Sequence, residues 1–191
     1  MEKRTCGVTA RIRKGLRKMK IRKTCPEDLE QVLKIYAHAR KFMAEHGNPR
    51  QWGPTNWPPE ELIRRDIAEG KSYVCETDHP AGVFYFDHGP DIEPTYDRIE
   101  EGSWEKDAPY GVVHRIASDG TAKGLGTVCL SWALEQCGYL RIDTHPDNRV
   151  MQNLLGKLGF VRRGVIHVAE DNDPRYAFDR SGEDASAEEE R

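Results

Sequence analysis

Residues 110–160, YGVVHRIASDGTAKGLGTVCLSWALEQCGYLRIDTHPDNRVMQNLLGKLGF, decide the fold. The apolar run 110–117 predicts a buried strand, and the turn after it, residues 118–126, contains three glycines. Residues 139–143 predict the next strand, and a helix is expected from residue 148 to about residue 158. Another helix is expected between the turn and that strand, because these side chains recur at helical spacing: Leu125, Val128, Cys129, Trp132, Ala133 and Cys137. This succession predicts an α/β domain.

The turn between strand and helix has the features of an anion-binding loop. A helix that begins directly after a strand presents unpaired backbone N–H groups at the positive end of its dipole. Gly124 and Gly126 would let a phosphate approach that backbone closely, and Lys123 adds a positive charge. The pattern is neither a Walker A loop nor a G-x-G-x-x-G fingerprint. The alternative is a glycine-containing helix start that packs tightly on a sheet.

The flanking sequence supplies the remaining elements of one domain. Residues 19–24 predict an opening strand, and Pro26 begins a helix that ends before Gly47. A proline-rich loop with Trp52 and Trp57 precedes the second helix. The other expected elements are the second helix at 58–70, strands at 72–75 and 81–86, a loop at 89–109 with one helical turn, and final strands at 160–168 and 175–178.

The composition limits the class of protein. The 191 residues are 37% hydrophobic and 32% charged, which is typical of one globular domain and excludes collagen-like and disulfide-rich chains. Because no run of about 18 apolar residues occurs, no membrane span is expected. Five cysteines without a C-x-x-C pair indicate reduced thiols, and hence a cytoplasmic protein.

The net charge of −3 is unevenly distributed. Residues 1–18 belong to a basic arm that is expected to be flexible, with Met19 as the natural start; counted to residue 23, this arm carries +9. Residues 181–191 form an acidic tail of −4 that is expected to be disordered, which leaves −8 on the body. A basic arm can bind nucleic acid, but the acidic body argues against nucleic acid as the partner.

Two motifs in the quoted stretch resemble those of the GNAT acyltransferase superfamily. The runs 140–148 and 154–160 resemble its closing motif, a strand end followed by Asn, a helix and Lys-x-Gly-Phe. The turn 121–126 is similar to its acyl-CoA pyrophosphate loop, [QR]-x-x-G-x-[GA]. The likeness covers residues 19–180 and implies an α/β fold with a mixed, mostly antiparallel sheet, flanked by helices and splayed at the acyl-CoA site.

A narrower likeness and three departures qualify this resemblance. Five blocks look like a bacterial GNAT branch: residues 47–52, 93–96, 104, 114–118 and 143–148. The usual Gln or Arg of the loop is Thr121, and the turn between Ala117 and Gly124 is two residues short in one alignment. Leu155 stands where many relatives place the tyrosine that protonates the departing thiolate, so no general acid is assigned.

The resemblance implies an N-acetyltransferase that moves an acetyl group from acetyl-CoA to a primary amine of a small molecule or peptide. The amine would attack directly in a ternary complex. The protein is expected to be a monomer or a homodimer. The alternative is a non-catalytic module that binds or senses acyl-CoA. No metal is expected, since Asp143, His145 and His114 have no further ligand at a convincing spacing.

The resemblance also assigns cofactor-binding residues. Pantetheine would lie beside the strand backbone, the diphosphate on the turn, and the pantetheine arm near the head of the last helix. The corresponding residues are Ile116, Ala117 and Ser118 for the strand, Thr121, Ala122, Lys123, Gly124, Leu125, Gly126 and Thr127 for the turn, and Asn148 for the helix.

Acid–base work is expected first of His145, which follows a strand end and has a side chain suited to proton transfer near neutrality. The alternative is that His145 only satisfies a backbone carbonyl at the Pro146 turn. His114 is the second candidate, although the sequence does not decide which face of its strand it occupies. Asp143, Glu93 and Tyr96 are weaker candidates.

Three aromatic residues are candidates for binding the acceptor: Trp52, Tyr96 and Trp104. They lie in loops that cover the acceptor cleft in the family, and aromatic faces can hold an amine by cation–π contact. The alternative is that Trp52 and Trp57 only anchor a proline-rich loop to the core. The −8 charge of the body favours a cationic acceptor.

Overall fold

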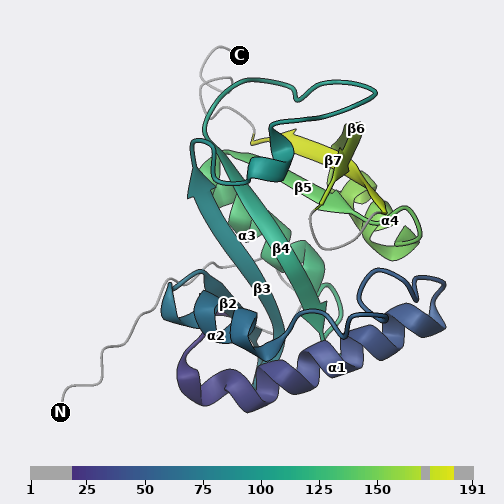
Figure 1. Cartoon of the computed structure of the whole chain (residues 1–191). Helices are drawn as coiled ribbons and strands as arrows, with labels where there is room; N and C mark the ends of the chain where they lie inside the picture. The colour runs from purple at the N-terminus through teal and green to yellow at the C-terminus, as the bar shows by residue number, and fades with distance from the viewer. Residues whose placement is uncertain (1–18, 169–172, 183–191) are drawn as a thin grey trace. The chain divides into compact units, whose positions relative to one another are not determined.

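The computed structural model describes residues 19–168 and 173–182 (Figure 1). The expected basic extension and most of the acidic tail lie outside these residues. The chain divides into two compact units, one made of the residues up to Phe86 and His114–Leu130, the other of Asp87–Val113 and the residues from Ser131 on. Strand β4 (Tyr110–Ser118) and helix α3 (Leu125–Cys137) contribute residues to both units.

The first unit contains strands β1 (Lys20–Lys23), β2 (Ser72–Glu76) and β3 (Pro80–Gly89), with the second half of β4. The first three strands pair antiparallel in sequence order. Just after the end of β4, the Asp119 amide donates to the Ala81 carbonyl at 3.0 Å. Helices α1 (Leu29–Glu45) and α2 (Glu60–Ala68) follow the expected boundaries closely. A short 3-10 turn at Pro26–Asp28 precedes α1.

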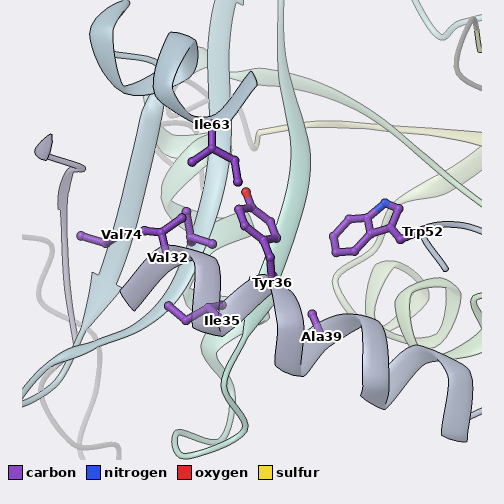
Figure 2. Packing of buried hydrophobic residues seen from close by; sticks show 9 residues of the cluster. Val32, Ile35, Tyr36, Ala39, Trp52, Ile63 and Val74 are labelled. Atoms are coloured by element: carbon purple, nitrogen blue, oxygen red, sulfur yellow. The ribbon is translucent and has the colours of Figure 1, made fainter. Parts of the chain in front are cut away.

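The core of this unit forms where α1 and α2 meet the strands. The buried residues of α1 are 32, 35, 36 and 39, which lie on one side of the helix. Figure 2 shows Tyr36 of α1 between Ile63 of α2 and Trp52. The strands contribute Val74, Val83 and Ala117. Burial of these apolar side chains is the main stabilising contribution to this unit.

The start of α3 packs on the opposite face of β3. Val83 faces α1 and α2, so its neighbour Gly82 faces the other way. A Cβ atom on Gly82 would lie 2.4 Å from Cδ2 of Leu125, the first residue of α3. Because Leu125 is only 3% exposed, its side chain has little room to move aside. Glycine at position 82 therefore lets the beginning of α3 approach the strand backbone.

The second unit contains the first half of β4, then β5 (Tyr139–Thr144), β7 (Pro174–Ser181) and β6 (Val161–His167) in that strand order. β4 and β5 pair in parallel, whereas β5 pairs with β7 and β7 with β6 antiparallel. Helix α4 (Arg149–Lys157) and a 3-10 turn at Pro94–Tyr96 complete it.

These elements confirm the expected α/β fold with a mixed, mostly antiparallel sheet. The last strand extends to Ser181, one residue past the expected end of the domain, because its pairing with β5 continues to Tyr139. Within residues 19–168 and 173–182, no helix is both long and apolar enough to cross a membrane.

Two glycine substitutions test the packing. Gly82→Ala is expected to lower the free energy of unfolding by about 1–3 kcal/mol, because the added methyl group overlaps Leu125. Gly156→Ala is the matched control in α4, where a Cβ atom meets nothing within 4 Å, and it is expected to raise stability by up to about 1 kcal/mol. Urea unfolding measures both; an unchanged midpoint for Gly82→Ala would contradict the close approach.

Candidate functional site

The turn from β4 into α3 is held by its own side chains. The Ser118 hydroxyl accepts from the Gly120 amide at 3.0 Å, and Asp119 Oδ1 accepts from the amide and hydroxyl of Thr121 at 2.9 and 2.7 Å. Asp119 Oδ2 also lies 3.1 Å from Nε2 of His79. The turn needs left-handed backbone at Gly120 and Gly124, with φ of 79° and 77°. These contacts fix the loop before any ligand binds.

The next backbone amides are open. Within the described part of the chain, no hydrogen bond occupies the N–H groups of residues 122–127. Lys123 is exposed and, among the described residues, forms no ion pair. The side chain of Leu125 is buried, so only its backbone can face a ligand. The Thr121 hydroxyl donates to Asp119, so it does not take the place of the Gln or Arg side chain that is usual at this position of the loop in the family. The arrangement suits an anionic group.

Strand β4 carries a local distortion just before this loop. Arg115 has φ of 53°, a left-handed conformation that costs a non-glycine residue about 1–3 kcal/mol. Arg115 Nη2 lies 2.8 Å from Oδ2 of Asp66 on α2, and its guanidinium lies 4.6 Å from the centroid of the Tyr85 ring on β3. Both side chains of the ion pair are largely buried. These contacts from two other elements hold the distorted backbone in place.

The ion pair belongs to a buried polar cluster. Burial raises the pKa of Asp66, and the charge and hydrogen bond of Arg115 offset this only in part. Burial also raises the pKa of Tyr36, whose ring lies nearby in the core. Arg115 Nε is buried and has no hydrogen-bond partner in the described residues. Because burial outweighs pairing at Asp66, the pair contributes geometry more than stability.

His114 lies next to this distortion. Its ring centroid is 5.8 Å from that of Tyr85, so two consecutive residues of β4, His114 and Arg115, flank the same ring. Regular strand alternation would send them to opposite faces, and the left-handed residue breaks that alternation. His114 is half-buried and therefore remains partly accessible.

His145, the first candidate for acid–base work, lies in the second unit and is fully buried. Its Nδ1 accepts from the Asp147 amide at 3.0 Å, which places the ring proton on Nε2, 3.1 Å from Oδ2 of Asp173. Both ring nitrogens are thus occupied. The geometry favours the alternative role of fastening the turn, although the group that it satisfies is a backbone N–H and not a carbonyl.

The neighbouring predictions fall on α4. Asn148 caps this helix, because its Oδ1 accepts from the Met151 amide at 3.1 Å. Its contact with pantetheine stays a prediction. Leu155 is completely buried in α4, so this position offers no acid. Among the described residues, no group of three His, Cys, Asp or Glu side chains could hold a metal ion.

The second unit also contains a pocket of about 500 Å³. It brings together two of the predicted acceptor residues: the ring centroids of Tyr96 and Trp104 are 5.1 Å apart, and Trp104 Nε1 donates to the Tyr96 carbonyl at 2.9 Å. The Tyr96 hydroxyl donates to Asp143 Oδ1 at 2.8 Å, and burial, followed by the charge of Asp143, raises the pKa of Tyr96. Trp52 instead lies in the core of the first unit, packed edge-on against Tyr36.

Several site residues were missed from the sequence. Asp66 and Arg115 form their pair across 49 residues, so no local pattern connects them. Arg141 lines the pocket and is only 6% exposed. A signal for Arg141 existed, because an arginine within the apolar strand 139–143 is unusual unless its charge is used or compensated.

The fold was compared with solved structures. An acetyltransferase of the GNAT family from Streptococcus agalactiae 2603 is 29% identical, with a TM-score of 0.79 over 89% of this chain and 99% of that one. A GNAT-family acetyltransferase from Listeria monocytogenes 4b F2365 is 17% identical (TM-score 0.62; 86% and 95% covered). Arabidopsis thaliana NAA60 in complex with acetyl-CoA is 12% identical (TM-score 0.57; 85% and 98% covered). No family model and no curated protein matches the chain.

The role of His145 can be decided by substitution. His145→Ala is expected to lower the free energy of unfolding by about 3 kcal/mol, because it removes a buried ring and two hydrogen bonds. His167→Ala, at a side chain that is 55% exposed in the same unit, is the control and should change stability little. Unchanged stability with abolished turnover would instead restore His145 as the acid–base residue.

Proposed function

This chain is an acyltransferase with the GNAT fold, and we propose that it moves an acetyl group from acetyl-CoA to a primary amine of a small molecule or peptide. The amine attacks directly while both substrates are bound. The observation that carries the proposal is the run of open amides at residues 122–127, at the start of a 13-residue helix. The acetyl-CoA bound to the Arabidopsis neighbour supports the choice of cofactor.

The loop fits the charged end of acetyl-CoA. Six consecutive amides at the positive end of the α3 dipole offer donors for a diphosphate, and the exposed Lys123 adds charge. The backbone of Ile116, Ala117 and Ser118 would run beside pantetheine. Acetyl-CoA supplies the activated acetyl group; the chain binds and orients it, and correct orientation of two reactants can contribute about 7–11 kcal/mol.

The distortion at Arg115 has a role in this proposal. A left-handed residue interrupts the regular ladder of its strand, and in this proposal one backbone N–H next to Arg115 points toward the ligand. Such an N–H would stabilise the negative charge that develops on the acetyl oxygen during attack. Asp66 acts through Arg115 and is a positioning residue.

His114 is the better-placed candidate to accept a proton from the amine. It lies beside the distortion and is half-buried, whereas His145 is fully buried. The general acid remains unassigned, since Leu155 is buried and apolar.

The aromatic pocket with Tyr96 and Trp104 would receive the acceptor. Four cysteines are free in the described residues, which supports a cytoplasmic location.

Cofactor binding and turnover can be measured separately. Acetyl-CoA is expected to raise the melting temperature, and adding amines should release free thiol. Lys123→Ala should weaken binding about tenfold, more at low salt, while Lys41→Ala, at an exposed lysine of α1, should not. Stabilisation without thiol release from any amine would favour the sensing module, and no stabilisation by any CoA species would refute the proposal.

The ion pair between Asp66 and Arg115 of β4 predicts that activity depends on pH. Because burial raises the pKa of Asp66, its carboxylate protonates early as the pH falls, and the ion pair with Arg115 is then lost. The kcat of the wild type should therefore decline toward acid pH through Asp66. Asp66→Asn should have a kcat at least about tenfold lower, and its kcat should not decline toward acid pH. Asp66→Glu should recover part of the lost kcat.

The control and the contrary result concern the same profile. Asp78→Asn, at an exposed carboxylate in the β2–β3 turn, should behave as the wild type. A purely structural role would lower the melting temperature of Asp66→Asn and leave the shape of its pH profile unchanged. An unaltered profile in a folded variant would thus remove Asp66 from the mechanism.

A further inference from the structure

The aromatic pocket of the second unit is lined by a buried, positively charged side chain, that of Arg141. Arg141 of β5 lines it, and its guanidinium carbon lies 4.1 Å from the ring centroid of Tyr110 and 4.6 Å from that of Trp104. The Tyr139 ring is 5.3 Å away. These distances allow cation–π contact between the guanidinium and all three rings. The volume of about 500 Å³ lies in the range of sites for small molecules.

The hydrogen-bonding edge of this guanidinium is incompletely used. Nη2 donates to the Lys106 carbonyl at 2.8 Å, and Nε to the Tyr139 hydroxyl at 3.4 Å. Nη1 has no hydrogen-bond partner among residues 19–168 and 173–182. Rings occupy the faces of a guanidinium, whereas a carboxylate binds at its edge through parallel N–H bonds. Arg141 therefore still has donors for an oxyanion.

Arg141 also lacks an ionic partner in the described part of the chain. The buried acid of its network is Asp179, which is already bound by Arg163 Nε, the Glu105 amide and the Tyr139 hydroxyl. Arg141 is only 6% exposed, and a buried guanidinium without a counter-ion is costly, which the rings compensate only in part. A carboxylate supplied by a ligand would complete the arrangement.

The same pocket has carboxylates of its own. Asp91, Asp97 and Asp107 line it, and none of them forms an ion pair within the residues that the structure describes. Lys106 lines the pocket as well. The carboxylates attract a positively charged group, and Arg141 and Lys106 attract a negative one. A ligand that carries an ammonium and a carboxylate satisfies both ends.

We infer that the pocket binds a free amino acid, with the carboxylate on Arg141 and an ammonium group toward the three aspartates. The inference rests on the proposed function, because it names the class of amine that serves as acceptor. It narrows the primary amines to those that carry a carboxylate. Polyamines and amino sugars, which are cationic without a carboxylate, would lack a partner for Arg141.

Pairs of amines that differ only in the carboxylate test this inference. Lysine against cadaverine and arginine against agmatine are compared as acceptors, with thiol release from acetyl-CoA as the readout. The wild type should favour the carboxylated member of a pair at least tenfold in kcat/KM. Arg141→Gln should lower kcat/KM for that member about a hundredfold, mainly through KM, and change the other member less than about threefold.

Matched variants keep the result interpretable. Arg162→Gln removes another arginine that lies over an aromatic ring, Tyr176, outside the pocket, and should leave the preference intact. Arg141→Lys keeps a cation but loses the paired N–H donors, and should still lose most of the preference. If neither Arg141 variant folds, the wild type alone tests the inference, through its preference for the carboxylated amine over the amine without a carboxylate in each pair. No preference, or equal losses for both members in Arg141→Gln, overturns the inference.

Direct binding separates this inference from the proposed function. Calorimetry with lysine and cadaverine, without acetyl-CoA, measures the pocket alone. Binding of lysine that Arg141→Gln abolishes supports the carboxylate site even where no thiol is released, and that outcome counts only against the acetyl transfer. Thiol release from amines without a carboxylate, together with no lysine binding, overturns the site and leaves the transferase standing.

Discussion

The ion pair between Arg115 and Asp66 holds β4 in a conformation that the strand would not adopt by itself. A left-handed arginine in a strand is unfavourable, and burial makes the ionised aspartate unfavourable as well. The strained backbone at Arg115 and the buried carboxylate of Asp66 both lower the stability of the fold. Both are explained if the backbone at this point must have a fixed shape, since Ile116–Ser118 and the open loop follow within a few residues. The Tyr85 ring adds a second contact to the same side chain, so the shape is determined from α2 and β3 together.

The parts of the structure that sequence reasoning reached are those set by neighbours along the chain. The ends of α1 depend on nearby residues, because Pro26 and Gly47 limit the expected helix, and α1 is observed at Leu29–Glu45. The loop after β4 depends on two glycines and on a helix start, both of which are local features. Asn148 at the head of α4 belongs to the same group, because a cap needs only the residues that follow it.

Contacts between distant residues account for what was not predicted. The partner of Arg115 lies 49 residues away, and that of His145 lies 28 residues away. A histidine after a strand looks the same in the sequence whether its ring is open or has both nitrogens bound. That local view favours His145 over His114, whereas in the structure His145 is fully buried and His114 only half-buried. The face of β4 that His114 occupies depends on the φ of Arg115, for which no sequence rule exists.

The aromatic residues show how the structure alters a chemical interpretation without discarding it. Aromatic side chains near a cleft suggest that a substrate cation lies on their faces. In this pocket a cation does lie over Trp104 and Tyr110, but it is the guanidinium of Arg141. Nη1 of Arg141 has no hydrogen-bond partner among the described residues and can bind an anion, and the aspartates around the pocket attract the amine. The expected preference for a cationic acceptor and the requirement for a carboxylate are then two ends of one ligand.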